Sequence, residues 1–109
     1  LPNYDIAPLL LSNFSKELIF NTSLVTLKNM GLEITYENIE EGTIEAVEKS
    51  FWYGFKDDLI IRIEELISSN ILINARSASR VGRSDLGKNS ERIKSYFILL
   101  KSELEINRR

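Results

Sequence analysis

Four short runs in the middle of the chain alternate apolar and polar residues, and this pattern constrains the fold more than any other feature. In "GLEITYE", residues 31–37, Leu32, Ile34 and Tyr36 point one way while the polar residues between them point the other way. A period of two is typical of a β-strand with one covered face. The other three runs are "TIEAVEKS" at 43–50, "DLIIRIEE" at 58–65 and "ILINARSAS" at 71–79.

Each later run also has one apolar face, and the connections between neighbouring runs are short. The segments "NIEEG" at 38–42 and "SSN" at 68–70 are typical of turns. Short connections favour antiparallel neighbours, so the sequence predicts a four-stranded antiparallel meander with one covered and one wetter face. We expect the covered face to carry Ile44, Ala46, Leu59, Ile61, Ile63, Ile71, Ile73 and Ala75.

Helical periodicity precedes the first strand. Residues 15–30 place most of their apolar side chains within an arc of roughly 140°, which predicts a helix with one covered stripe. Ser12 and Ser15 offer side-chain oxygens for the helix start, and Gly31 is suited to a left-handed end. Leu18 and Val25 lie off the stripe, which is formed by Ile19, Phe20, Leu24, Leu27 and Met30.

The end of the chain has the clearest helical pattern. Its apolar residues follow the steps i, i+3, i+4, i+7 and i+11, which is typical of an amphipathic helix. Ser84 or Asp85 could cap the start of this helix. The stripe is formed by Ile93, Tyr96, Phe97, Leu100 and Leu104.

These elements predict a single domain over residues 1–109, in the order α-β-β-β-β-α. A chain of this length forms one core, and the economical arrangement is a two-layer α+β sandwich with both helices on one face of the sheet. The first twelve residues contain Pro2 and Pro8, and we expect them to form an extended arm laid on the domain.

The composition excludes several classes of chemistry. The chain has no cysteine and no histidine, so disulfides, thiolate metal sites and serine–histidine or cysteine–histidine catalysis are ruled out. We predict no catalytic residue, metal site or cofactor. The net charge of −2 gives no general attraction to nucleic acid or to anionic membranes. No apolar run approaches the roughly 20 residues of a membrane span.

The first residue is Leu1 rather than a methionine, so we expect that an upstream segment was processed or left out. Any membrane association is expected to come through a partner or through that segment. The location of the protein does not follow from the absence of cysteine.

Polar groups are concentrated in "NARSASRVGRSDLGKNSERI", residues 74–93, where the last strand leads into the final helix. One interpretation is structural: caps and glycines form the corner, and the arginines pair with Asp57, Asp58 and Asp85. The other is functional: Arg76, Arg80 and Arg83 join the free amides of a helix N-terminus to form a carboxylate or phosphate pocket. The glycine spacing does not match a P-loop or dinucleotide-binding loop.

The stretch "RSASRVGRSDLGKNSERI", preceded by "GFKDDLIIRI", resembles the signature of DUF1499, a domain family of unknown function. The resemblance runs from about residue 6 to residue 100. Family members occur in bacteria and photosynthetic eukaryotes, and the resemblance implies an exported, periplasmic or plastid (thylakoid) location rather than a cytoplasmic one. It implies no established activity, cofactor or catalytic residue. The matching positions are Asp57, Asp58, Arg76, Ser77, Ser79, Arg80, Gly82, Asp85, Gly87, Asn89 and Arg92.

Two further groups have both a structural and a functional interpretation. Asp57 and Asp58 are adjacent in a predicted strand, so they point to opposite faces and cannot share one proton or metal ion. An ion-pair role is favoured over acid–base chemistry. The aromatics of "SFWYGF", residues 50–55, either pack in the core or, if Trp52 is exposed, form a platform for a partner.

The leading hypothesis is a non-enzymatic binding or accessory module that engages a protein complex or an acidic ligand through the arginine-rich joint or the aromatic corner. The first alternative is a small-ligand-binding protein or a minor hydrolase with its site at Asp57, Asp58, Asp85 and the arginines. The second is a purely structural joint. The lack of a basic groove disfavours nucleic acid. The candidate binding residues are Arg76, Ser77, Ser79, Arg80, Arg83, Ser84, Asp85, Asn89, Arg92, Asp57, Asp58 and Trp52.

Overall fold

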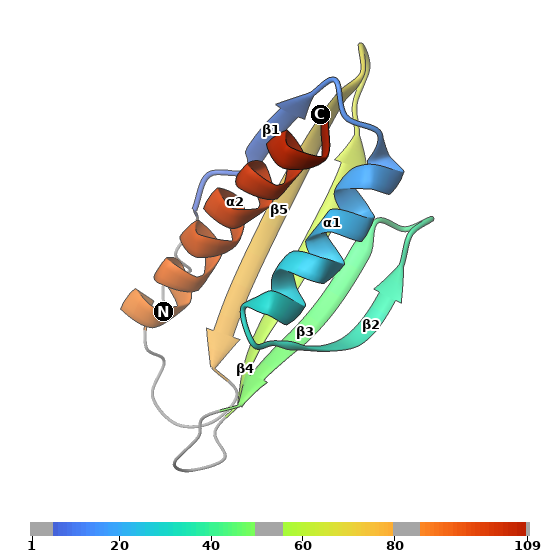
Figure 1. The fold of residues 1–109 in the computed structure, drawn as a ribbon. Helices are drawn as coiled ribbons and strands as arrows, with labels where there is room; N and C mark the ends of the chain where they lie inside the picture. Colours follow the sequence, from blue (N-terminus) through green and yellow to red (C-terminus); the bar gives the residue numbers. More distant parts are fainter. Residues whose placement is uncertain (1–5, 50–55, 80–85, 109) are drawn as a thin grey trace.

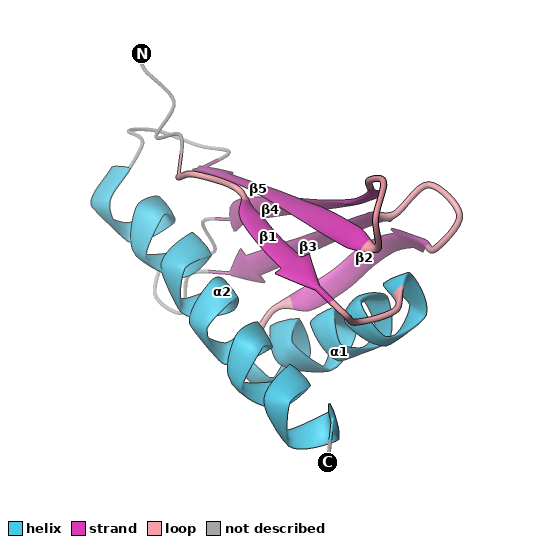
Figure 2. Cartoon of the chain, turned by 90° about the horizontal axis from the view of Figure 1, so that it is seen from above, coloured by secondary structure: helices cyan, strands magenta, loops and turns pink. Residues whose placement is uncertain are grey.

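Two helices lie side by side on one face of an antiparallel β-sheet in the computed structural model of the protein (Figure 1). The structure describes residues 6–49, 56–79 and 86–108. The view from above shows both helices on the same side of the sheet, so the predicted α+β class with the helices on one face is confirmed (Figure 2). The elements are β1 (Leu9–Ser12), α1 (Lys16–Asn29), β2 (Glu33–Asn38), β3 (Thr43–Lys49), β4 (Lys56–Glu65), β5 (Asn70–Ser79) and α2 (Leu86–Arg108).

The described residues form a sheet of five strands, so the prediction of four was wrong. The strand order is β1-β5-β4-β3-β2, in which the four predicted strands form the expected meander and β1 is added beside β5. Part of the predicted arm forms β1, with Leu9 opposite Ile73 and Ser12 opposite Asn70. Leu9 packs on the core while Leu10 is exposed. The consecutive leucines hid this alternation in the sequence.

Helix α1 begins and ends where its sequence predicts. The Ser15 side-chain oxygen accepts a hydrogen bond from the Leu18 amide at 3.0 Å, which caps the first turn. At the other end Gly31 adopts a φ of 91°, a left-handed conformation that suits glycine. Ile19 is fully buried, whereas Val25 lies on the exposed side, as its place off the apolar stripe indicates.

Strand β2 departs from the predicted alternation at Tyr36. The pairing shifts between Ile34, which lies opposite Ala46, and Tyr36, which lies opposite Glu45. This irregularity turns Tyr36 away from the core, and the side chain is 41% exposed. The prediction that Tyr36 shares a face with Ile34 was therefore wrong, because an extra residue in a strand reverses the faces that follow it.

The core lies between the sheet and the two helices. The predicted apolar faces of β3, β4 and β5 meet the α2 stripe there, and Leu100 and Leu104 are fully buried. The helices are also joined by a buried hydrogen bond of 2.7 Å between the hydroxyl oxygens of Ser23 and Tyr96. Burial raises the pKa of Tyr96, while the bond to Ser23 opposes that rise. The inward side chains of the sheet are apolar except at one end, which is described next.

Candidate functional site

A polar cluster is buried where β5 leads toward α2, at the end of the sheet opposite the β4–β5 turn. We call it the Arg92 cluster; it consists of Glu48, Asp57, Ser77, Ser79, Asn89 and Arg92. Its central guanidinium belongs to a side chain that is only 4% exposed. Charged groups are rarely buried unless they are paired, so the partners of Arg92 decide what this cluster can do.

The guanidinium of Arg92 donates hydrogen bonds to four side chains of the cluster. Its Nε donates to Glu48 Oε1 at 2.8 Å, and its Nη2 lies 2.6 Å from the same oxygen. Nη2 also donates to Asp57 Oδ2 at 2.9 Å. Nη1 donates to Ser77 Oγ at 2.8 Å and to Asn89 Oδ1 at 2.6 Å. Each of the three guanidinium nitrogens therefore has a partner within the cluster.

The neighbours of Arg92 are bonded to one another as well. Ser77 Oγ donates to Asn89 Oδ1 at 2.7 Å, and Asn89 Nδ2 donates to Ser79 Oγ at 3.5 Å. Lys88 Nζ lies 3.6 Å from Asp57 Oδ2, at the solvent side of the cluster. Across the described residues, no buried side-chain nitrogen or oxygen lacks a hydrogen-bond partner. The side chains of the cluster therefore form a connected hydrogen-bond network.

The register of the sheet explains why these side chains meet. Glu48 pairs with Asp57, and Asp57 pairs with Ser79, so one row across β3, β4 and β5 carries all three. Two carboxylates opposite each other would repel, and Arg92 lies between them as a shared cation. Asn89 and Arg92 are three residues apart on α2, which places them on the same side of that helix. The network therefore joins three strands to the start of α2.

The predicted binding residues divide into three groups. The structure brings Asp57, Ser77, Ser79, Asn89 and Arg92 together in the cluster. Arg76 and Asp58 lie on the opposite face of the sheet, because each is one residue away from an inward-facing neighbour. Trp52, Arg80, Arg83, Ser84 and Asp85 lie outside the described residues.

Sequence reasoning missed Glu48 and Lys88. Glu48 is two residues beyond Ala46, so the alternation of β3 already placed its carboxylate on the covered face. A charged residue at an inward position of a strand was the signal, because such a charge needs a partner. Lys88 carried no comparable signal. It lies one residue before Asn89 in α2, where its side chain is about half exposed.

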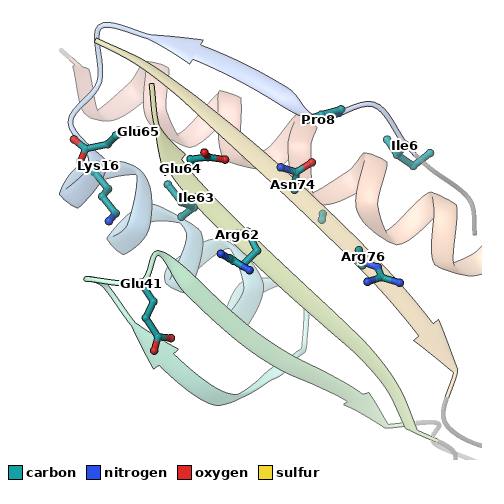
Figure 3. A pocket seen from close by; sticks show the side chains of 11 residues that line it. Ile6, Pro8, Lys16, Glu41, Arg62, Ile63, Glu64, Glu65, Asn74 and Arg76 are labelled. Carbon is teal, nitrogen blue, oxygen red and sulfur yellow. The ribbon is translucent and has the colours of Figure 1, made fainter. Parts of the chain in front are cut away.

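A second feature lies on the other face of the sheet, which neither helix covers (Figure 2). An open trough of about 800 Å³ runs across this face. Figure 3 views it with the helices behind the sheet, and the side chains of Arg62, Asn74 and Arg76 lie along β4 and β5. The other lining residues are Ile6, Pro8, Lys16, Glu41, Ile63, Glu64, Glu65 and Ala75.

Two arginines stand close together in this trough. Arg62 pairs with Asn74, and Arg76 pairs with Ile60, so the two arginines occupy diagonal positions on neighbouring strands. Diagonal residues of this kind are roughly 7–8 Å apart at the backbone. Both arginines are exposed, and neither makes a hydrogen bond or ion pair with another residue of the described chain. Glu64 and Glu65 lie nearer the β4–β5 turn.

Two further findings concern the described ranges, 6–49, 56–79 and 86–108. Among these residues there is no group of three or more aspartates or glutamates placed to hold a metal ion. Neither of the two helices described there has the length and apolar character that a membrane crossing requires.

A comparison with known protein families matches residues 1–100 to "Protein of unknown function (DUF1499)". The chain belongs to the DUF1499 family. The match spans nearly the whole chain and includes every residue of the Arg92 cluster and both arginines of the trough. No curated protein matches the sequence.

Among solved structures, 14 chains resemble this DUF1499 protein. One comes from the crystal structure of the adenylate sensor of AMP-activated protein kinase in complex with 5-aminoimidazole-4-carboxamide 1-beta-D-ribofuranotide. The TM-score is 0.66 and the sequence identity is 10%, over 86% of this chain and 94% of that chain. At this identity the likeness shows the fold alone.

Proposed function

We propose that this DUF1499 protein is a non-enzymatic binding module that engages an acidic partner protein through Arg62 and Arg76. The observation that carries the proposal is the contrast in pairing. The two guanidiniums of the trough are exposed and have no partner among the described residues, whereas Arg92 is buried and hydrogen-bonded to four side chains of the Arg92 cluster. Exposed arginines suit carboxylates because the planar guanidinium can donate two parallel hydrogen bonds.

The surroundings of the two arginines favour a protein partner over a small ligand. Ile60 lies opposite Arg76 and next to Arg62 on the same face, and it is 38% exposed. Apolar surface beside arginine is common at the energetic centre of protein interfaces. The trough is open rather than enclosed, whereas small-molecule sites usually bury most of their ligand. A protein surface that bears carboxylates fits both the apolar surface beside the arginines and the open shape of the trough.

The alternative with a small-ligand or hydrolytic site at the joint has less support. It requires Asp57, Asp58 and arginines to converge on one cavity, but the two aspartates lie on opposite faces of the sheet. Asp57 is also held by Arg92 and is largely buried. We propose instead that the Arg92 cluster has a structural role and fixes the start of α2 on the sheet.

Charge reversal on the open face tests the proposed function. The double variant R62E/R76E is compared with the wild type and with K101E, which reverses an exposed charge on α2 outside the trough. Each protein is immobilised and used to capture binding proteins from the cells that make it, after circular dichroism has confirmed that all three are folded.

The proposal expects a partner that wild type and K101E retain and that R62E/R76E loses, with an affinity drop of at least about tenfold. Binding to the wild type should also weaken as the salt concentration rises, because exposed charge pairs are screened. Capture of the same proteins, with the same affinity, by all three would contradict it.

A further inference from the structure

The outer edge of β5 is only half covered. β5 runs from residue 70 to residue 79, but β1 pairs with residues 70–73 alone. Figure 1 shows β1 beside one half of β5 only. Pro8 directly precedes β1, and proline has no N–H to continue a ladder. Within the described part of the chain, residues 74–79 therefore have a strand partner on the β4 side and none on the other side.

The main-chain groups that face this free edge follow from one hydrogen bond. The Leu66 amide, one residue beyond β4, donates to the Asn70 carbonyl at 2.7 Å, and this bond continues the register of the β4–β5 ladder, in which Glu65 lies opposite Ile71. In antiparallel strands hydrogen-bonded pairs recur at every second residue, which directs the main chains of Asn74, Arg76 and Ala78 toward β4. The N–H and C=O groups of the residues between them, Ala75, Ser77 and Ser79, therefore point to the free edge.

A bond on the other side of β4 agrees with this assignment. The Ile63 amide donates to the Gly42 carbonyl at 2.7 Å, on the β3 side of the strand. The odd-numbered residues of β4 thus bond toward β3, and the even-numbered ones bond toward β5. A sheet edge with a row of unpaired N–H and C=O groups is a template for another strand.

Basic side chains stand on both faces of this edge. Arg76 projects from β5 on the open face of the sheet. On the other face, Arg92 lies on the flank of α2 that reaches β4 and β3. By helical geometry the opposite flank, with Ser90 and exposed Lys94, lies on the side of the free edge. The charges beside the edge therefore favour an acidic occupant.

We propose that an extended acidic segment of the partner protein adds to residues 74–79 of β5 as a further strand. Its main chain bonds to Ala75, Ser77 and Ser79, and its carboxylates meet Arg76 on one face and Lys94 on the other. This inference rests on the proposed function and names the form that the partner takes. Addition of a strand to a sheet edge is a common mode of peptide recognition, in which the main chain supplies affinity.

Synthetic peptides separate main-chain pairing from simple charge attraction. The probe is an eight-residue peptide of alternating glutamate and threonine, titrated into the ¹⁵N-labelled protein. Two further peptides carry N-methyl groups on either the glutamates or the threonines. Alternate N–H groups of a bound strand face β5, so only one of the two methylated peptides should lose its hydrogen bonds.

The inference expects that one methylated peptide binds at least about tenfold more weakly while the other binds like the parent. The amides of Ala75, Ser77 and Ser79 should exchange slowly with solvent only when the parent peptide is bound. The glutamates of the bound strand all lie on one face, which the proposed function places on the open side beside Arg76. R76E should therefore weaken binding, and K94E and K101E should not.

Several results would overturn the inference. One such result is that all three peptides bind equally well to the wild type and that R62E/R76E binds none of them. It would support the proposed function but contradict the addition of a strand. Absence of parent-peptide binding at millimolar concentration would also contradict that addition. Slow exchange of the three amides in the free protein would show that the chain itself covers the edge, and a dimer by sedimentation would assign the edge to a second copy.

Discussion

Arg92 and Arg76 come from the same arginine-rich stretch, but the two sides of the sheet give them different surroundings. Arg92 lies on the helix-covered side, is 6% exposed, and donates to two carboxylates, a serine and an asparagine. Arg76 lies on the open side, without such partners among the described residues. The arginine-rich stretch is therefore not one site. The face of the sheet decides which arginine serves stability and which is available to a partner.

The largest effect is expected from Arg92→Ala. The substitution leaves Asp57 and Glu48 side by side without their cation, and loss of one partner from a buried ion pair typically costs about 3–5 kcal/mol. Urea unfolding followed by circular dichroism measures the change. Arg76→Ala is the matched control and should change the free energy of unfolding by less than about 0.5 kcal/mol. Equal decreases in the free energy of unfolding would contradict the different roles assigned to the two arginines.

A smaller loss is expected from Asp57→Asn. The amide keeps the shape of the side chain but removes the charge that faces Arg92 Nη2, and a hydrogen bond to a charged group contributes about 1.5–3 kcal/mol. Glu64→Gln, on the exposed part of β4, serves as the control. Chemical denaturation of both variants gives the comparison. If Asp57→Asn lowers the free energy of unfolding no more than Glu64→Gln does, the Arg92 cluster does not stabilise the packing of α2 on the sheet.

Tyr96→Phe should cost about 1 kcal/mol, because it removes a neutral buried hydrogen bond to Ser23. The substitution also changes how the free energy of unfolding depends on pH in the alkaline range. The pKa of Tyr96 is raised by burial, so above pH 10 the unfolded chain loses this proton first and the folded state is progressively disfavoured. The free energy of unfolding, measured at several pH values between 8 and 11, should fall less steeply with pH for Tyr96→Phe than for the wild type. Identical slopes would contradict the burial of this hydroxyl.

The smallest effect on stability, and the largest on binding, is expected from Arg62→Ala and Arg76→Ala. Each side chain is exposed, so the free energy of unfolding should change by less than about 0.5 kcal/mol. Affinity for the acidic partner should fall in each variant and fall further in the double variant. Calorimetric titration provides the affinities. If Arg92→Lys lost more affinity than Arg76→Ala, the binding site would lie on the helix-covered face, contrary to the proposal.

The fold followed from periodicity except where local sequence concealed it. Helix α2 and the four strands of the meander were predicted because their apolar residues recur at clean intervals. Strand β1 was missed because Leu9, Leu10 and Leu11 show no alternation, and its partner β5 is distant in the sequence. The irregularity at Tyr36 is set by pairing with β3, which no local pattern reports.

The site was predictable in part for the same reason. Alternation along β5 separates Ser77 from Arg76, so the two could not have served one pocket. The prediction that adjacent Asp57 and Asp58 face opposite ways is confirmed by the register. Which cation would reach Asp57 depended on how α2 packs on the sheet. That is a tertiary arrangement, and the sequence favoured no single arginine.

The most direct test of separate roles for the two faces is a ¹⁵N chemical-shift map that includes the arginine Nε–H signals. The labelled protein is titrated with the alternating glutamate–threonine peptide. Signals of Arg62, Asn74 and Arg76 should move while the Nε–H signal of Arg92 stays in place and remains protected from exchange. Movement centred on Arg92 and Asn89, with Arg62 and Arg76 unchanged, would contradict the account.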